Sequence, residues 1–228
     1  MVEYDKNAIV PPYITDYLRK TAAHSDEFLH SLEAYAKEHS VPIIEPESAQ
    51  LLRLLCTMKK PRKILEIGCA IGYSSILMAK CARDAEIITI EYNTEMIRIA
   101  RENIKSAGLS ERIKVIEADA KDYLAYIDDD ESFDMIFLDG PKAHYIYMLD
   151  DTVRLLKKDG VFISDNVLYK GMTADDEHII RRKITIVNRL RDYIDTLMRH
   201  PQLQSVLLPL GDGVTISVKT VSEKEINC

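Results

Sequence analysis

From Lys63 onward, the chain alternates between short apolar runs and longer segments in which apolar residues recur at helical spacing. Short apolar runs bounded by turn residues predict strands, and recurrence at i, i+3 and i+4 predicts helices. A chain that repeats strand and helix in this way folds as an α/β protein, with a mostly parallel, doubly wound sheet. The predicted strands are Lys63–Ile67, Glu86–Glu91, Ile113–Glu117, Phe133–Asp139, Gly160–Asp165, Ser205–Pro209 and Val214–Lys219.

The two ends of the chain depart from this alternation. The last two predicted strands are joined by the tight turn Gly211-Asp212-Gly213, which predicts an antiparallel hairpin at one edge of the sheet. Helix starts are predicted at Pro11-Pro12, at Ser25-Asp26-Glu27 and at Pro46. We therefore expect one domain over residues 1–228, with a helical extension (1–60) and a Rossmann-like core (61–220).

Composition excludes several classes of protein. No apolar run approaches the roughly 20 residues that cross a membrane, and the acidic start of the chain is unlike a signal peptide. The four cysteines form no CxxC pair, which favours reduced thiols and a cytoplasmic protein. A formal charge of −7 argues against a general nucleic-acid coat, although a local basic patch stays possible.

The turn after the first predicted strand is the first candidate binding element. Glu66 ends the apolar run, Gly68 and Gly72 are four residues apart, and Tyr73-Ser74 starts a helix. Glycine lets the backbone approach a ligand closely, but ordinary strand-to-helix turns also use it. The spacing alone therefore leaves both interpretations open.

Acidic residues end the next two strands. Glu91 lies about 20 residues beyond the turn, where a carboxylate can accept hydrogen bonds from ribose hydroxyls, and Asp119-Ala120 ends the third strand. Each acid alone could simply cap a helix. Together with the glycine turn, they indicate a nucleoside site. Ala70 stands where a dinucleotide site would have a further glycine, so an NAD-dependent dehydrogenase is disfavoured and a nucleoside without phosphates, such as S-adenosylmethionine, is favoured.

A second group of polar residues ends the fourth and fifth strands. Asp139, Asp165 and Asn166 should meet at one edge of the sheet, because these strands are neighbours in this topology. Carboxylate and amide oxygens are hard ligands that suit Mg²⁺ or Mn²⁺, and three protein ligands leave positions open for water and substrate. Lys142 would overhang the same pocket as a candidate general base. The alternatives are two unrelated helix-capping aspartates and a surface lysine.

Taken together, these residues resemble the metal-dependent class I O-methyltransferases of the catechol and caffeoyl-coenzyme A type, over roughly Val41 to Lys219. The resemblance implies a Rossmann-like class I methyltransferase fold, S-adenosylmethionine as methyl donor, and a homodimer. It implies metal ligation by Asp139, Asp165 and Asn166, with Lys142 as the base. The expected cofactor-binding residues are Ile44, Glu66, Gly68, Gly72, Ser74, Glu91, Asp119, Ala120 and Asp139.

Within that family, the chain is most similar to the bacterial branch that methylates 5-hydroxyuridine in tRNA. That similarity rests on the run Asp165–Gly171, on His200-Pro201 and on the Gly-Asp-Gly turn. The same chemistry on a small catechol or hydroxycinnamoyl acceptor is the alternative. A nucleoside-binding module without catalysis is disfavoured, because binding alone requires neither the candidate metal ligands nor the lysine.

Two basic clusters are candidate RNA-binding surfaces, or else ordinary solvated faces. One comprises Lys59, Lys60, Arg62 and Lys63. The other comprises Arg181-Arg182-Lys183 with Arg189 and Arg191, all expected on one long helix within residues 170–199. The side chains expected to face inward from that helix are Ile184, Val187, Leu190 and Ile194.

Overall fold

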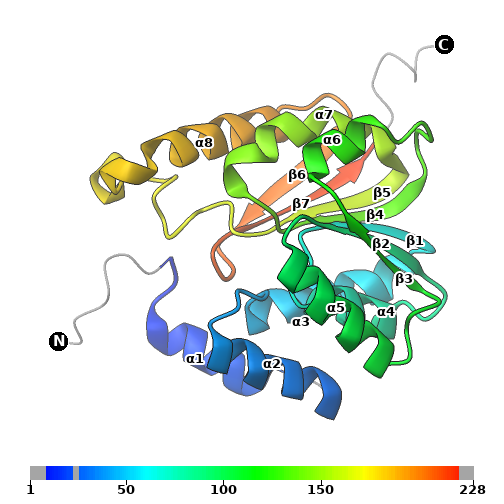
Figure 1. Ribbon diagram of the computed structural model, residues 1–228. Coiled ribbons are helices and arrows are strands. Elements are labelled where there is room, and N and C mark those ends of the chain that lie inside the picture. The colour runs from blue at the N-terminus through cyan, green and yellow to red at the C-terminus, as the bar shows by residue number, and fades with distance from the viewer. Residues whose placement is uncertain (1–8, 23–25, 221–228) are drawn as a thin grey trace.

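The computed structural model describes residues 9–22 and 26–220, and one sheet runs through its centre (Figure 1). The strand order is β3-β2-β1-β4-β5-β7-β6. The predicted sheet of seven strands, mostly parallel, is confirmed. Its strands are β1 (Lys63–Ile67), β2 (Glu86–Glu91), β3 (Ile113–Glu117), β4 (Phe133–Leu138), β5 (Leu156–Ser164), β6 (Leu203–Leu208) and β7 (Val214–Lys219).

Strands β1 to β5 pair in parallel, so their carboxyl ends lie at the same edge of the sheet. The predicted antiparallel hairpin is formed by β6 and β7. Within the hairpin, β7 runs antiparallel to both of its neighbours and lies between β5 and β6. The turn of the hairpin therefore lies at the same edge as the carboxyl end of β5, because Ser164 pairs with Thr215.

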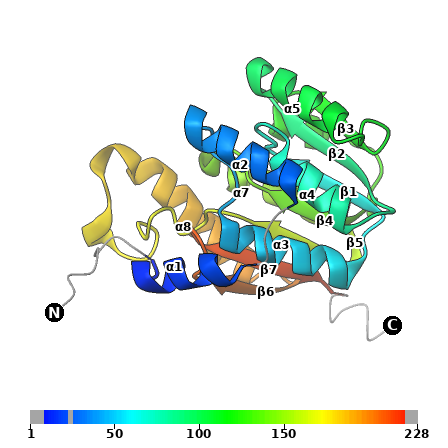
Figure 2. The same cartoon turned by 90° about the horizontal axis from the view of Figure 1, so that it is seen from below.

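Helices cover both faces of the sheet (Figures 1 and 2). One hydrophobic cluster joins the sheet to α2, α3, α4 and α5, and a second joins its other face to α6, α7 and α8. The helices are α1 (Pro12–Thr21), α2 (Glu27–His39), α3 (Pro46–Lys59), α4 (Tyr73–Cys81), α5 (Thr94–Ser106), α6 (Ala120–Ala125), α7 (Tyr145–Leu155) and α8 (Ile184–Met198), with short 3₁₀ turns η1 (Lys142–His144), η2 (Asp176–His178) and η3 (Arg181–Lys183).

The helices before β1 differ in how they are attached. Helices α2 and α3 contribute to the same core as α4, whereas α1 has no buried residue. Arg19 of α1 pairs with Glu45 and Glu47 at the start of α3, at 2.6 and 2.9 Å. The division at residue 60 stays a prediction, and Ser25 of the predicted helix start lies outside the described residues.

Two strands are longer than predicted. β5 begins at Leu156, directly after α7, rather than at Gly160. Its first residue pairs with Phe133. A register shift between Phe133 and Met135 then accommodates the polar residues before Gly160, where Asp159 has a φ of 60°. β6 begins at Leu203, two residues before the predicted start, because Leu203 pairs with Lys219.

The prediction of one long helix through the second basic cluster is wrong in its first half. Residues 181–183 form the separate turn η3, and α8 begins only at Ile184. Ile184 is exposed rather than inward, because it lies in the first turn of α8. The stripe that faces the sheet is Val187, Leu190, Tyr193 and Leu197.

No helix within the described ranges is long and apolar enough to cross a membrane. Cys56, Cys69 and Cys81 are free thiols. The acidic start of the chain and Cys228 lie outside the described residues.

Candidate functional site

A cavity of about 920 Å³ opens at the carboxyl ends of the parallel strands. Its wall combines the ends of β1, β2, β3 and β4 with the connection between α2 and α3. The parallel topology brings together residues that are far apart in the sequence. The predicted site residues that line it are Ile44, Gly68, Ser74, Glu91, Asp119, Ala120, Asp139, Lys142 and Asn166.

Gly68 allows two strand ends to meet. Its φ is +88°, and a Cβ at this position would lie 2.4 Å from the backbone oxygen of Asp139. No larger residue fits between the end of β1 and the residue that follows β4 without a backbone shift. Gly72, with a φ of +84°, precedes α4 but does not line the cavity.

Glu91 fixes the turn after β1 from the neighbouring strand. One carboxylate oxygen accepts a hydrogen bond from the Ala70 N–H at 3.1 Å, and the other accepts from the Tyr92 and Asn93 N–H groups at 3.0 Å. The first of these bonds holds Ala70 at a φ of 43°, a conformation that non-glycine residues rarely adopt. Glu91 thus organises the turn in addition to lining the cavity.

Asp119 both caps a helix and lines the cavity. Its carboxylate caps α6 by accepting a hydrogen bond from the Lys121 N–H at 2.9 Å. The same exposed side chain lines the cavity beside Ala120. Capping therefore does not compete with ligand contact here.

Glu66 lies beneath the cavity rather than in its wall. The side chain is fully buried, and one carboxylate oxygen accepts hydrogen bonds from the hydroxyls of Ser75 and Thr89, the latter at 2.6 Å. The other oxygen, Oε1, has no hydrogen-bond partner. Burial raises the pKa of Glu66 to about 7, since a charged carboxylate is poorly solvated there.

Asp139 and Asp165 follow paired residues of β4 and β5. Leu138 pairs with Ser164, and the Asp165 N–H donates to the Leu138 carbonyl at 2.9 Å. Asp165 is 1% exposed; its Oδ1 accepts from the Asn166 N–H at 2.7 Å, while Oδ2 has no hydrogen-bond partner. Burial, and next the charge of Asp139, raise the pKa of Asp165. Asp165 is not in the wall of the cavity, although Asn166 is.

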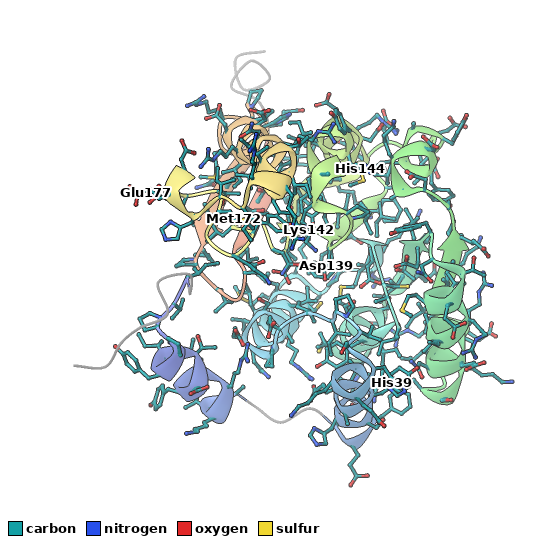
Figure 3. All side chains as sticks on the ribbon, turned by 60° about the vertical axis from the view of Figure 1, so that its left-hand side comes forward. His39, Asp139, Lys142, His144, Met172 and Glu177 are labelled. Carbon is teal, nitrogen blue, oxygen red and sulfur yellow. The ribbon has the colours of Figure 1, made fainter. Side chains whose placement is uncertain are left out.

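Lys142 lies beside Asp139 at the cavity (Figure 3). Its Nζ is 2.9 Å from Asp139 Oδ1, and both side chains keep about a fifth of their surface exposed (23% and 19%). The turn η1 sets this geometry, because it begins at Lys142, three residues after the aspartate. An amine here can form an ion pair or exchange a proton with a ligand.

Three oxygen donors at this edge fit a hard divalent cation. The Oδ2 atom of Asp165 has no hydrogen-bond partner. The carboxylates of Asp139 and Asp165 repel each other unless a cation offsets their charge. Asn166 adds an amide oxygen that lines the cavity. Within the described ranges, no three His, Cys, Asp or Glu side chains converge as a metal site, so a metal here would need the Asn166 amide as well as the two carboxylates.

Part of the cavity wall is not evident from the sequence. Every residue from His39, the last of α2, to Glu45 lines it, although the sequence predicts only Ile44. Tyr92, Met96, Met148 and His144 also line it. None of these residues lies in a motif. Tyr92 and His144 could have been found from their positions just after a predicted strand end or beside Lys142.

Comparison with known proteins gives a consistent result. A family model described as O-methyltransferase matches residues 19–220. A catechol O-methyltransferase from Niastella koreensis is 30% identical over 172 residues, which cover 73% of this chain and 76% of the relative.

Solved structures share the same fold. One is a Staphylococcus aureus protein provisionally assigned as a caffeoyl-CoA O-methyltransferase. Its TM-score is 0.84 and its sequence identity is 32%, and the alignment covers 91% of this chain and 99% of the Staphylococcus aureus chain. An O-methyltransferase from Bacillus cereus in complex with S-adenosylhomocysteine has a TM-score of 0.80 and 26% identity, with coverages of 91% and 97%.

Proposed function

The chain belongs to the O-methyltransferase family, and we propose that it methylates a hydroxyl of a small acceptor that carries a second oxygen beside it, with the help of Mg²⁺ or Mn²⁺. The methyl donor of the enzyme is S-adenosylmethionine. The Bacillus cereus relative binds S-adenosylhomocysteine, which is the product left after that donor gives up its methyl group. The observation that carries the proposal is the Asp139–Lys142 pair beside the orphaned oxygen of Asp165, at the edge of a cavity large enough for two ligands.

The donor would lie between the turn after β1 and the ends of β2 and β3. Glu91 would accept hydrogen bonds from the ribose hydroxyls, and Asp119 would contact the adenine. Gly68, Ser74 and Ala120 border this part of the cavity. Ile44 covers it from the connection between α2 and α3. Glu66 and Gly72 would act indirectly, by shaping the turn.

Asp139, Asp165 and Asn166 would hold the divalent cation. The cation would supply positive charge that favours the ionised form of the acceptor hydroxyl. The buried Asp165 cannot rotate freely, because its Oδ1 is fixed by the Asn166 N–H and its own N–H by β4. This leaves Oδ2 as the free donor atom.

Lys142 would take the proton of the acceptor hydroxyl. The O–CH₃ bond then forms as the S–CH₃ bond of the donor breaks, and S-adenosylhomocysteine leaves with the electron pair on sulfur. The rest of the cavity would contribute by holding the hydroxyl in line with the methyl group, which is worth several orders of magnitude in rate.

The basic clusters bear on the choice of acceptor. Lys59–Lys63 precede or begin β1, so they lie roughly 13 Å or more from its carboxyl end, given about 3.3 Å per residue. Lys59 donates to the Asp159 carbonyl at 2.6 Å, and Lys63 lies over the ring of Phe133. This cluster is therefore poorly placed to hold an RNA whose base enters the cavity, and the small acceptor is favoured.

One observation keeps 5-hydroxyuridine in tRNA as a second candidate. Arg181 and Arg182 of η3 are exposed on the segment that follows the candidate metal ligand Asn166. Arg191, in contrast, is occupied by Asp176 at 2.6 Å and by the Thr173 carbonyl at 2.9 Å. The homodimer and the cytoplasmic location stay predictions.

A methyl-transfer assay tests the proposal. S-adenosylmethionine and Mg²⁺ would be offered with a panel of catechols and hydroxycinnamoyl thioesters, and in parallel with tRNA that carries unmethylated 5-hydroxyuridine. We expect turnover of a small vicinal diol that a chelator abolishes and Mg²⁺ restores. Turnover of tRNA alone, with rates that fall steeply as salt rises, would replace the small acceptor with RNA. Full activity with the chelator would end the metal proposal.

A further inference from the structure

The turn of the β6–β7 hairpin lies beside the segment that follows Asn166 (Figure 1). The Val167 N–H donates to the Gly213 carbonyl, and the Leu168 N–H donates to the Asp212 carbonyl, both at 3.0 Å. A third bond runs from the Lys170 N–H to the carboxylate of Asp212. Three hydrogen bonds thus join this turn to residues 167–170, across more than 40 residues of sequence.

The segment needs such support, because its backbone is strained. Asn166, Tyr169 and Lys170 have φ values of 57°, 46° and 58°, in the left-handed region that L-residues rarely adopt. Strained conformations of this kind persist only where the surroundings fix them. The Asp212 carboxylate accepts a hydrogen bond from the strained residue Lys170. The Asp212 carbonyl accepts one from Leu168, which directly precedes the strained pair Tyr169 and Lys170.

The turn itself is closely packed on both sides. A Cβ on Gly213 would lie 2.4 Å from the Leu168 side chain, and a Cβ on Gly211 would lie 2.7 Å from Ser48 Oγ on α3. The turn therefore packs between the start of α3 and the strained segment. Asp212 is carried on a rigid support, and its carboxylate has a fixed position from which to hold Lys170.

From these contacts, we propose that Asp212 is a positioning residue for the acceptor half of the site. It holds residues 166–170 in the strained conformation that presents the Asn166 amide to the cation. Asp212 itself touches neither ligand. The inference rests on the proposed function, because it assigns the Asn166 amide to the metal.

The role requires an acceptor oxygen at the right distance, not a negative charge. Asp212→Asn keeps an oxygen that can accept from the Lys170 N–H, whereas Asp212→Ala removes it. Asp175 provides the matched control. It lies in the connection between β5 and α8, which also contains residues 166–170, but it does not line the cavity. Its carboxylate also accepts a backbone hydrogen bond, from the Glu177 N–H at 3.0 Å. Asp175→Ala should therefore affect only η2.

The experiment combines two readouts on the wild type and these three variants. Isothermal titration would measure Mn²⁺ and S-adenosylhomocysteine binding, and hydrogen exchange with mass spectrometry would follow the amides of residues 167–173. We expect Asp212→Ala to weaken Mn²⁺ binding about 10- to 100-fold, as losing a residue that orients a metal ligand does, with S-adenosylhomocysteine affinity within about twofold. Exchange in 167–173 should speed up. Asp212→Asn and Asp175→Ala should stay close to wild type.

Other outcomes overturn the inference in distinguishable ways. Unchanged exchange and Mn²⁺ affinity in Asp212→Ala would show that the segment holds itself. Equal losses in Asp212→Asn and Asp212→Ala would show that charge, not position, matters. If the wild type binds no Mn²⁺, the proposed metal site is wrong, and so is the statement that Asp212 positions a metal ligand. The exchange data would still decide whether Asp212 holds residues 167–170 in place. Should Asp212→Ala fail to fold, Asp212→Glu, which moves the acceptor oxygen, must show the same losses.

Discussion

Lys142 is the residue on which the proposed proton transfer depends. Its amine is held 2.9 Å from Asp139 Oδ1 at the cavity, so the side chain has a defined position. We expect Lys142→Ala to lower kcat about 10²- to 10⁴-fold, the usual contribution of a general base, and to leave the affinity for S-adenosylhomocysteine within a few-fold. Steady-state kinetics and calorimetry measure the two quantities. A kcat close to that of the wild type would remove the lysine from the reaction.

Glu66 makes the stability of the protein depend on pH. Its folded-state pKa of about 7 lies above the ordinary value of 4.5, so the folded protein retains a proton that the unfolded chain releases. The stability that this proton contributes is complete below about pH 4.5 and is lost as the pH rises through about 7. At about 1.4 kcal/mol per pH unit, the rise from 4.5 to about 7 corresponds to a loss of about 3 kcal/mol of folding stability at pH 8.

Glu66→Gln tests this linkage. The glutamine oxygen can still accept from Ser75 and Thr89, but the side chain no longer ionises. Urea unfolding at several pH values should show a variant more stable than the wild type at pH 8, with the difference vanishing near pH 5. Glu86→Gln, at an exposed position at the start of β2, should leave the pH profile unchanged. Parallel profiles for Glu66→Gln and the wild type would contradict the assignment.

At the scale of elements, the contact between the β1 turn and the end of β4 should be the least tolerant part of the site. Gly68→Ala would bring a methyl group to 2.4 Å from the Asp139 carbonyl, in addition to the cost of a positive φ. Gly108→Ala pays the φ cost alone, because nothing lies within 4 Å of its Cβ position. We expect a loss of about 1 kcal/mol in Gly108→Ala and of at least about 3 kcal/mol in Gly68→Ala.

The two glycine variants should also differ in their affinity for the donor product, S-adenosylhomocysteine. Only Gly68→Ala should weaken S-adenosylhomocysteine binding, since Gly68 lines the cavity and Gly108 does not. Chemical denaturation and calorimetry on both variants give the comparison. Equal stability losses would mean that the two strand ends can separate without cost.

Sequence alone predicted the elements with local patterns and missed those defined by distant partners. β1 to β3 were placed with their observed bounds, because their apolar runs end at clear turn residues. β5 was cut short, since its polar first half is recognisable as strand only when Phe133 pairs with Leu156. The start of α8 was placed too early, because the basic run has the composition of a helix although it forms a separate turn.

The candidate site divides in the same way. Residues that end parallel strands, such as Glu91 and Asp139, were predictable, because topology alone brings them to one edge. The connection between α2 and α3 and the Asp212 turn were not, because each reaches the site through packing with segments far away in the sequence. Their residue types carry no chemistry that would distinguish them from ordinary loops.

At the scale of the whole molecule, the helices on the two faces of the sheet support different parts of the site. Helices α2 to α5 pack on one face, and α6 to α8 pack on the other face together with Val167, which follows β5. The proposed donor half borders the connection between α2 and α3, whereas the proposed acceptor half borders the segment after β5, which the hairpin turn also contacts. The proposed metal lies where the two halves meet, at the ends of β4 and β5.

The most direct test of the account is therefore a crystal structure of the protein with Mn²⁺, S-adenosylhomocysteine and a catechol. Anomalous scattering locates the metal without assumptions about activity. We expect one peak about 2.1 Å from oxygens of Asp139, Asp165 and Asn166, with both catechol oxygens among its ligands and the Lys142 amine beside one of them. A peak bound by other residues, or a catechol seated away from Lys142 with no metal between, would contradict it.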